Sequence, residues 1–277
     1  MLAGIAYNRR MRSIVALFAA VVLSASSAPA QWLQFPTAGI PRTPDGKPNL
    51  AAPAPRASDG KPDFSGMWRL ADPLPCDGIN RVCGDLAISL QFTNLGLGLK
   101  GGVPYQPWAI DKIKNKGLTD DPYTRCLARG GPRMHLLPTM KKMVQTPGLL
   151  IILDEYNASY RQIFTDGRAL PVDPQPTWNG NSSGHWEGDT LVVDSIGYRD
   201  DQWLDARGSP LTEAGRVTER FRRPNFGNLE IEVTVNDPKA YTRPWTATIR
   251  QTAVVDTEML DLICLENEKD VQHLTVK

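Results

Sequence analysis

His185 is the residue of this chain whose neighbours most clearly offer chemistry. Glu187 and Asp189 follow it at short spacing, and an imidazole beside carboxylates is a common set for general acid–base catalysis. The same stretch is also typical of a hairpin, in which a Gly-Asp turn joins two strands and by itself accounts for Glu187 and Asp189. One hypothesis is therefore a cofactor-independent lyase, isomerase or hydrolase that uses His185 with a carboxylate.

Two strand carboxylates are the expected partners of His185. Asp194 and Glu232 lie in predicted strands beside apolar residues, a setting that favours a general base. Ser183 shares the face of His185, because side chains alternate along a strand. The sequence has no nucleophile elbow, phosphate-binding loop or dinucleotide fingerprint. No such motif therefore indicates a different catalytic mechanism.

The sequence predicts neither a metal site nor a cofactor. His135, His185 and His273 lie far apart in the chain, and none has a second histidine at the spacing of paired metal ligands. No cysteine pair has zinc-finger spacing either. His135 is flanked by apolar residues, so we expect it to be packed or to lie in a loop.

A group of aromatic residues supports a second hypothesis, the binding of a small molecule. Aromatic side chains at strand ends would give the mouth of a barrel a flat apolar wall, with the hydroxyl of Tyr and the indole N–H of Trp as polar groups. Such a wall suits an amphipathic or aromatic ligand. They could equally plug the ends of a barrel core, and an arginine among them could orient a ligand or pair with a surface carboxylate. The candidate ligand-binding residues are Tyr160, Arg161, Trp178, Trp186, Trp203 and Trp245.

Short β-strands are the elements that must position these residues. Runs of β-branched and aromatic residues alternate with tight polar turns, which predicts a mainly β protein. The predicted strands cover 64–70, 140–145, 149–155, 160–164, 183–186, 190–195, 216–222, 229–235, 245–251 and 259–265. We expect an antiparallel meander that forms a barrel or half-barrel, lipocalin-like in shape, because closure removes exposed edges. One or two short helices are expected, one of them at 107–117.

Alternation of residue types assigns faces to these strands. The run 149–155 is apolar on both faces and should be central and buried. In 229–235 an apolar row alternates with a polar row that contains Glu230 and Glu232, and in 216–222 the row of Val217, Glu219 and Phe221 alternates with arginines. The opposed Glu and Arg rows predict a solvated ladder on the outside, with a polar lumen as the alternative.

The first thirty residues are typical of a secretory signal peptide. Arginines 9, 10 and 12 precede an apolar stretch at 14–23, and Ala28-Pro29-Ala30 matches a cleavage site. The apolar stretch is shorter than the roughly 20 residues of a membrane span. A Pro/Gly-rich arm at 31–63, with a repeated Asp-Gly-Lys-Pro, then precedes a single β domain at 64–277. We expect a soluble periplasmic or secreted protein.

Charge and cysteine content restrict partners and compartment. The formal net charge is +1, which argues against a nucleic-acid partner. In an oxidising compartment an even number of cysteines favours disulfides. Four cysteines allow three connectivities, which the sequence leaves open. In one of them Cys76 and Cys83, which enclose a short loop that closes easily, pair with each other, and Cys126 pairs with Cys264. The sequence leaves the ligand and the oligomeric state open, and a third hypothesis is an envelope structural or interaction protein whose core holds no cavity.

Several strings of this chain resemble those of a family of exported bacterial proteins. DGKPDFSGMW (59–68), VQTPG (144–148), GHWEGDTLVVD (184–194), DPKAYTRPW (237–245) and CLEN (264–267) recur together in that family. The resemblance covers nearly the whole chain after residue 30 and implies relatedness and export. It assigns no activity and no catalytic residue. A sister group has arginine at the position of His185, which argues against His185 as a shared catalytic group.

Overall fold

The structure is a computed structural model that describes residues 35–71, 89–117 and 119–264. The predicted signal peptide, Cys76 and Cys83 lie outside the described residues. The chain divides into two compact units, Met1–Pro36 with Asp256–Glu258 and Thr37–Val255 with Met259–Lys277. The second unit contains every helix and strand named below.

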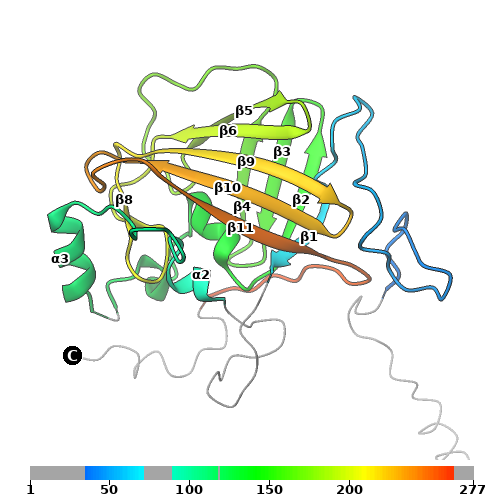
Figure 1. Cartoon of the computed structure of the whole chain (residues 1–277), viewed down its shortest axis with the longest axis horizontal. Coiled ribbons are helices and arrows are strands. Elements are labelled where there is room, and N and C mark those ends of the chain that lie inside the picture. Colours follow the sequence, from blue (N-terminus) through cyan, green and yellow to red (C-terminus); the bar gives the residue numbers. More distant parts are fainter. Residues whose placement is uncertain (1–34, 72–88, 118, 265–277) are drawn as a thin grey trace, which may run out of the picture. The chain divides into compact units, whose positions relative to one another are not determined.

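Nine strands close into a barrel in the order β1-β11-β10-β9-β6-β5-β4-β3-β2 (Figure 1). Their bounds are β1 Gly66–Leu70, β2 Lys141–Thr146, β3 Leu149–Asp154, β4 Ser159–Phe164, β5 Asn181–Glu187, β6 Thr190–Ile196, β9 Arg216–Asn225, β10 Asn228–Asn236 and β11 Trp245–Val254. This confirms the predicted mainly β fold and its closure. The meander has one exception, because β4 and β5 run parallel.

Short elements accompany the barrel. They are β7 Gln202–Trp203, which pairs with β8 Pro210–Leu211, the helices α2 Leu90–Thr93 and α3 Pro107–Asn115, and the 3₁₀ helices η2 Pro122–Arg125 and η3 Gly131–Leu136. The helix α3 begins with a proline at its first turn, as the sequence predicted. All six residues of η3 are buried, and they include His135.

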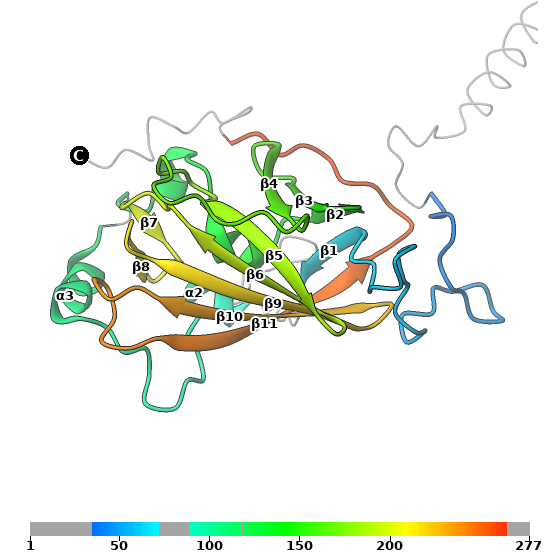
Figure 2. The ribbon, with the colours of Figure 1, turned by 90° about the horizontal axis from the view of Figure 1, so that it is seen from above.

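The barrel closes through its first strand. β1 pairs with β2 on one side and with β11 on the other (Figure 2). The predicted closing strand at 259–265 was therefore wrong. Up to Cys264 that segment contributes one β-bridge, between Leu262 and Tyr156 in the turn after β3. A short apolar run has the same pattern whether it enters a barrel or lies beside it.

Alternate side chains fill the barrel interior. In β10 the row from Leu229 to Val235 is buried, while Glu230 and Glu232 face outward. Arg222 pairs with Glu230 across β9 and β10 on that outer face, which confirms the predicted solvated ladder. The strand β3 has a neighbour on each side, but only alternate residues are fully buried and its outer face is half-buried, so the prediction of burial on both faces was wrong.

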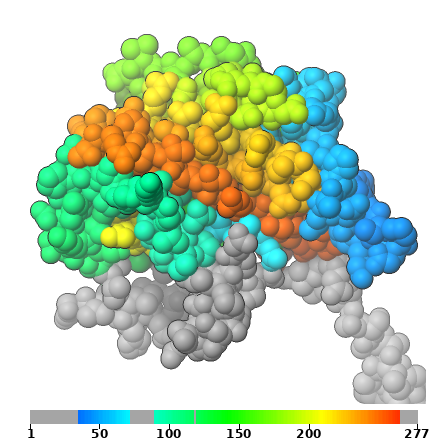
Figure 3. All heavy atoms as spheres, in the orientation of Figure 1, coloured from blue at the N-terminus to red at the C-terminus, as the bar shows by residue number. Residues whose placement is uncertain are grey.

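The arm before β1 forms two small hairpins of the same design. A bridge joins Arg42 to Pro48 in the first and Arg56 to Pro62 in the second. Each turn needs a glycine with positive φ, Gly46 at 82° and Gly60 at 79°. The arm contacts the turn between β9 and β10 through backbone hydrogen bonds, and the blue arm in Figure 3 lies beside these strands.

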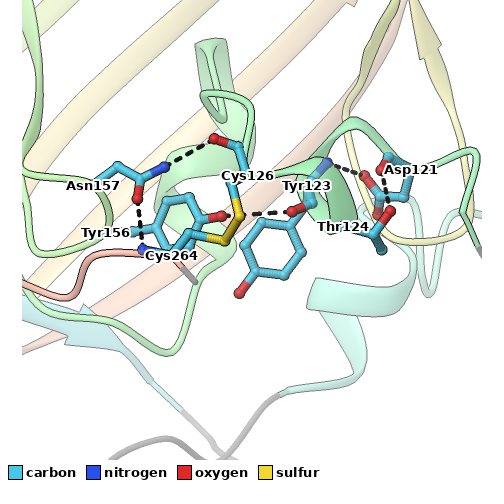
Figure 4. Close-up of a disulfide and its surroundings, with 7 residues drawn as sticks. All are labelled: Asp121, Tyr123, Thr124, Cys126, Tyr156, Asn157 and Cys264. Carbon is cyan, nitrogen blue, oxygen red and sulfur yellow. Dashed lines mark hydrogen bonds between the residues drawn. A yellow bond between two sulfur atoms is a disulfide. The ribbon is translucent and has the colours of Figure 1, made fainter. Parts of the chain in front are cut away.

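The disulfide between Cys126 and Cys264 confirms one of the two predicted pairs. Asn157 holds both of its chain segments: the Asn157 amide donates to the Cys126 carbonyl at 3.0 Å, and the Cys264 N–H donates to the Asn157 Oδ1 at 2.8 Å (Figure 4). The bond thus joins the segment after η2 to the segment that follows β11. Within the described ranges, no helix has the length and apolar character needed to span a bilayer.

Candidate functional site

A cavity of about 730 Å³ opens between β4 and β5. Among the described residues, the parallel ladder between these two strands consists of two residue pairs, Ile163 with Ser182 and Phe164 with Ser183. Towards Ser159 the strands therefore separate, and the link from residue 165 to 180 passes beside them (Figure 1). The cavity lies at this corner of the barrel and is lined by β4, the link and the start of β5.

Aromatic and neutral polar side chains share this cavity. Tyr160 of β4 is 59% exposed and Trp178 comes from the link. The amide of Asn179 donates to the Tyr160 carbonyl at 2.8 Å, which ties the link to β4. Gln162 and Asn181 add further amide groups to the lining. Flat aromatic surface beside a few neutral donors and acceptors is the usual composition of a small-molecule site.

A close backbone approach positions Trp178. A Cβ atom on Gly130 would lie 1.4 Å from the Trp178 carbonyl oxygen, so a side chain at that position is incompatible with this packing. The guanidinium carbon of Arg199 lies 5.0 Å from the centroid of the Trp178 ring, a distance at which cation and ring attract each other. The first contact fixes the backbone of Trp178, and the second favours the observed position of its ring.

The rim of the cavity is electrically balanced. Arg168 lies with its guanidinium carbon 3.7 Å from the Phe164 ring centroid and pairs with Asp166 at 2.6 Å. The hydrogen bond from Arg168 lowers the pKa of Asp166, so both groups are charged near neutral pH. The Ser183 hydroxyl donates to the Arg168 carbonyl at 2.5 Å, which anchors the link on β5.

Beneath the cavity lies a buried polar cluster. Arg161 of β4 donates to the hydroxyls of Ser182 at 3.2 Å and Ser195 at 3.1 Å, and to the Glu219 carboxylate at 3.1 Å. The Nε2 atom of His135 lies 3.2 Å from the Glu219 Oε1, and both side chains are fully buried. The cluster therefore joins β4, β5, β6, β9 and η3 behind the corner where β4 and β5 separate.

The charges of this cluster compensate one another. Burial alone would raise the pKa of Glu219, but the charge of Arg161 and the hydrogen bonds from His135 and Arg161 lower it to about 2. Burial lowers the pKa of His135 despite the attraction of Glu219, so the imidazole is neutral at neutral pH. Burial by itself would lower the pKa of Arg161, but the negative charge of Glu219 outweighs this effect and the pKa is raised overall. The buried ion pair of Arg161 and Glu219 therefore carries no net charge.

The six predicted ligand-binding residues do not gather in one place. Tyr160, Arg161 and Trp178 line the cavity between β4 and β5, although the guanidinium of Arg161 is engaged in the buried cluster. Trp186 stacks on Phe64 with ring centroids 5.7 Å apart. It lines a separate cavity of about 360 Å³ between the arm and the barrel.

The two remaining tryptophans are packing residues. Trp245 is buried against Tyr241, with ring centroids 5.4 Å apart. Trp203 is buried in β7, and the Lys116 ammonium lies 5.2 Å from its ring centroid. These positions correspond to the alternative reading of the aromatic set, in which tryptophans fill the ends of a barrel.

The predicted acid–base residues lie on the outer face of the barrel. The His185 side chain is 60% exposed, and its Nε2 lies 3.3 Å from the Glu187 Oε1. Glu187 is also bound by Arg220 at 2.8 Å. Hydrogen bonds from Arg220 and His185 lower the pKa of Glu187. His185 thus takes part in a solvent-facing charge ladder.

Neither candidate partner base faces the cavity. Asp194 accepts from the Thr218 hydroxyl at 2.6 Å and lies 3.2 Å from Arg216. Burial would raise the pKa of Asp194, but these contacts lower it overall, the opposite of what a general base needs. Glu232 is exposed in the polar row of β10.

Sequence reasoning missed the amides of the cavity and the role of Glu219. The alternation of β9 had already placed Glu219 on the inward face with Val217 and Phe221, which was a signal for a buried partner. Gln162, Asn179 and Asn181 carried no such signal, because polar residues at strand ends and in links are common. Among the described residues no three His, Cys, Asp or Glu side chains come together as a metal site.

No protein-family model matches the chain, and no curated protein matches it either.

Proposed function

We propose that this is an exported protein that binds a small amphipathic or aromatic molecule in the cavity between β4 and β5. The observation that carries the proposal is the meeting of Tyr160 and Trp178 in one space of about 730 Å³. That volume falls within the range of about 300–1,000 Å³ of small-molecule sites. The resemblance to exported bacterial proteins and the disulfide support the assignment to an oxidising compartment.

The lining favours an uncharged ligand. Arg161 and Arg168 are the charged side chains of the lining, and each is already paired with a carboxylate, Glu219 and Asp166 respectively. A charged ligand would compete with these pairs or remain uncompensated. A ring with hydroxyl or carbonyl groups would instead stack on Tyr160 or Trp178 and exchange hydrogen bonds with the nearby amides.

Native mass spectrometry of the protein purified from its own envelope tests the proposal directly, because a retained molecule would add its mass to the folded chain. A titration with 2-naphthol, followed by tryptophan fluorescence, then locates the site. We expect Trp178→Ala to weaken binding by about tenfold or more, as loss of one aromatic contact in a site costs on the order of 1–2 kcal/mol.

Trp108→Ala is the matched control, because Trp108 is 43% exposed on α3 and does not line the cavity. It should bind 2-naphthol like the unaltered protein. Equal loss of binding in both variants, or 2-naphthol binding that Trp178→Ala leaves unchanged, would overturn the assignment to this cavity.

A further inference from the structure

A second pocket of about 310 Å³ lies between α3 and the loop that precedes it. Its apolar wall consists of Val103 and Tyr105 from the loop and Ile110 and Ile113 from the helix. The helical residues Ile110, Ile113 and Lys114 stand at i, i+3 and i+4, so they share one face of α3. This pocket is separate from the cavity between β4 and β5, with which it has no lining residue in common.

The walls of this pocket are fixed by the surrounding structure. The Tyr105 hydroxyl is hydrogen-bonded to Ser209 at 2.7 Å, so its ring rather than its polar end is held beside the pocket. The loop folds closely on itself, since a Cβ on Gly96 would lie 2.1 Å from Val103. The helix is anchored by Trp108, whose indole N–H donates to the Lys239 carbonyl at 2.7 Å. The pocket is therefore preformed.

Two cations stand at the pocket, and no carboxylate of the described residues pairs with either of them. Lys114 and Arg207 both line it, and within the described ranges neither forms an ion pair with a carboxylate. Arg199, by comparison, is paired with Asp201 on the surface. The nearby Asp205 is buried and accepts from the Leu95 N–H and the Ser209 hydroxyl, so it turns away from these cations.

From this arrangement we infer that the pocket is a second ligand site, which takes a carboxylate with a short apolar body. The apolar part would lie on Ile110, Ile113 and Val103, where it leaves water. The carboxylate would lie at the mouth between Lys114 and Arg207, which supply the positive charge that the ligand needs. The inference does not depend on the proposed function of the other cavity.

Octanoate is the probe for this site. We expect saturable binding that perturbs the methyl NMR signals of Val103, Ile110 and Ile113. Octan-1-ol has the same apolar body without the charge and should bind about tenfold more weakly, and higher ionic strength should weaken octanoate alone. The double variant Lys114→Gln, Arg207→Gln should lose about tenfold in octanoate affinity, the combined effect of two exposed charge contacts.

Lys112→Gln is the matched control, because Lys112 lies on the same helix beside Trp108 and does not line the pocket. It should bind octanoate as the unaltered protein does. Absence of saturable octanoate binding, equal affinity for octanoate and octan-1-ol, or unchanged affinity in the double variant would each overturn the inference. Because the altered side chains are exposed, far-ultraviolet circular dichroism should show an unchanged fold in all variants.

Discussion

Arg161 of β4 and Glu219 of β9 form an ion pair inside the barrel, and both side chains are fully buried. Between β4 and β9 in the sheet lie β5 and β6, each of which contributes a serine to the same cluster. The pair therefore acts where backbone pairing is weakest, at the parallel corner of β4 and β5. Arg161 also donates to Ser182 of β5, so the cluster joins β4 to β5 where their backbone ladder is short.

Breaking this pair should destabilise the protein strongly. In Arg161→Met the Glu219 carboxylate stays buried without its partner, and we expect a loss of about 3–5 kcal/mol in the free energy of unfolding. The double variant Arg161→Met, Glu219→Leu removes both charges and should recover most of that loss, because an apolar replacement needs no compensation. Urea unfolding measures both. A double variant no more stable than the single one would contradict this account.

The buried cluster should also make stability depend on pH. The folded pKa of Glu219, about 2, lies below its ordinary 4.5, so its contribution is complete above pH 4.5 and is lost as pH falls towards 2. Burial lowers the pKa of His135 below its ordinary 6.5. Its contribution is complete above pH 6.5 and is lost as pH falls below that value, since the unfolded chain binds the proton first.

The free energy of unfolding should therefore decline from about pH 6.5 downward in two windows. His135→Gln should flatten the upper window and leave the lower one, which a series of urea titrations between neutral and acid pH can resolve. If the variant and the unaltered protein decline in parallel through the upper window, His135 is not responsible for it.

Removing the Cys126–Cys264 disulfide should cost about 2–5 kcal/mol, because the bond closes a loop with a sequence separation of 138 residues. The variant Cys126→Ser, Cys264→Ser tests this by urea unfolding. A reductant should then shift the unfolding midpoint of the variant less than that of the unaltered protein. Equal shifts in both would show that this bond contributes little.

His185→Ala should leave the binding of 2-naphthol unchanged. The side chain is 60% exposed and contacts Glu187 on the outer face, and it does not line the cavity of Tyr160 and Trp178. The same fluorescence titration gives the answer. A loss of affinity comparable to that of Trp178→Ala would restore His185 as a functional residue.

Gly130→Ala should weaken ligand binding without altering any residue of the cavity lining. The added methyl group would collide with the Trp178 carbonyl, so the link must move and carry the indole with it. We expect both a lower unfolding midpoint and a lower affinity for 2-naphthol. Gly167→Ala is a suitable comparison, because a Cβ there meets no atom within 4 Å and only its positive φ adds strain. Equal affinity in the two variants would show that the Trp178 position tolerates the displacement.

The alternation of apolar and polar residues predicted the strands well where one face of the strand is buried and the other is exposed to solvent. β10 shows why, since its apolar and charged residues alternate along the whole strand and only one register buries the apolar row. The neighbours of a strand are less visible in a sequence. The partner of β11 is β1, nearly two hundred positions earlier in the numbering, and a local pattern contains no information about such a pairing.

Only part of the candidate site could be predicted from the sequence, because residue types are visible in a sequence and strand neighbours are not. Tyr160 and Trp178 were selected by residue type, as was Trp186, and type alone could not separate them. Their positions depend on the corner at which β4 and β5 run parallel, and the proline-rich link gave no indication of that direction. Glu219, by contrast, could have been selected, because a charged residue in an inward row demands a partner.

The pairing of β1 with β11 has a consequence for biosynthesis. Until the residues of β11 have left the ribosome, β1 and β10 each have an open edge, and no barrel exists. A product truncated before Trp245 would carry both edges and should aggregate.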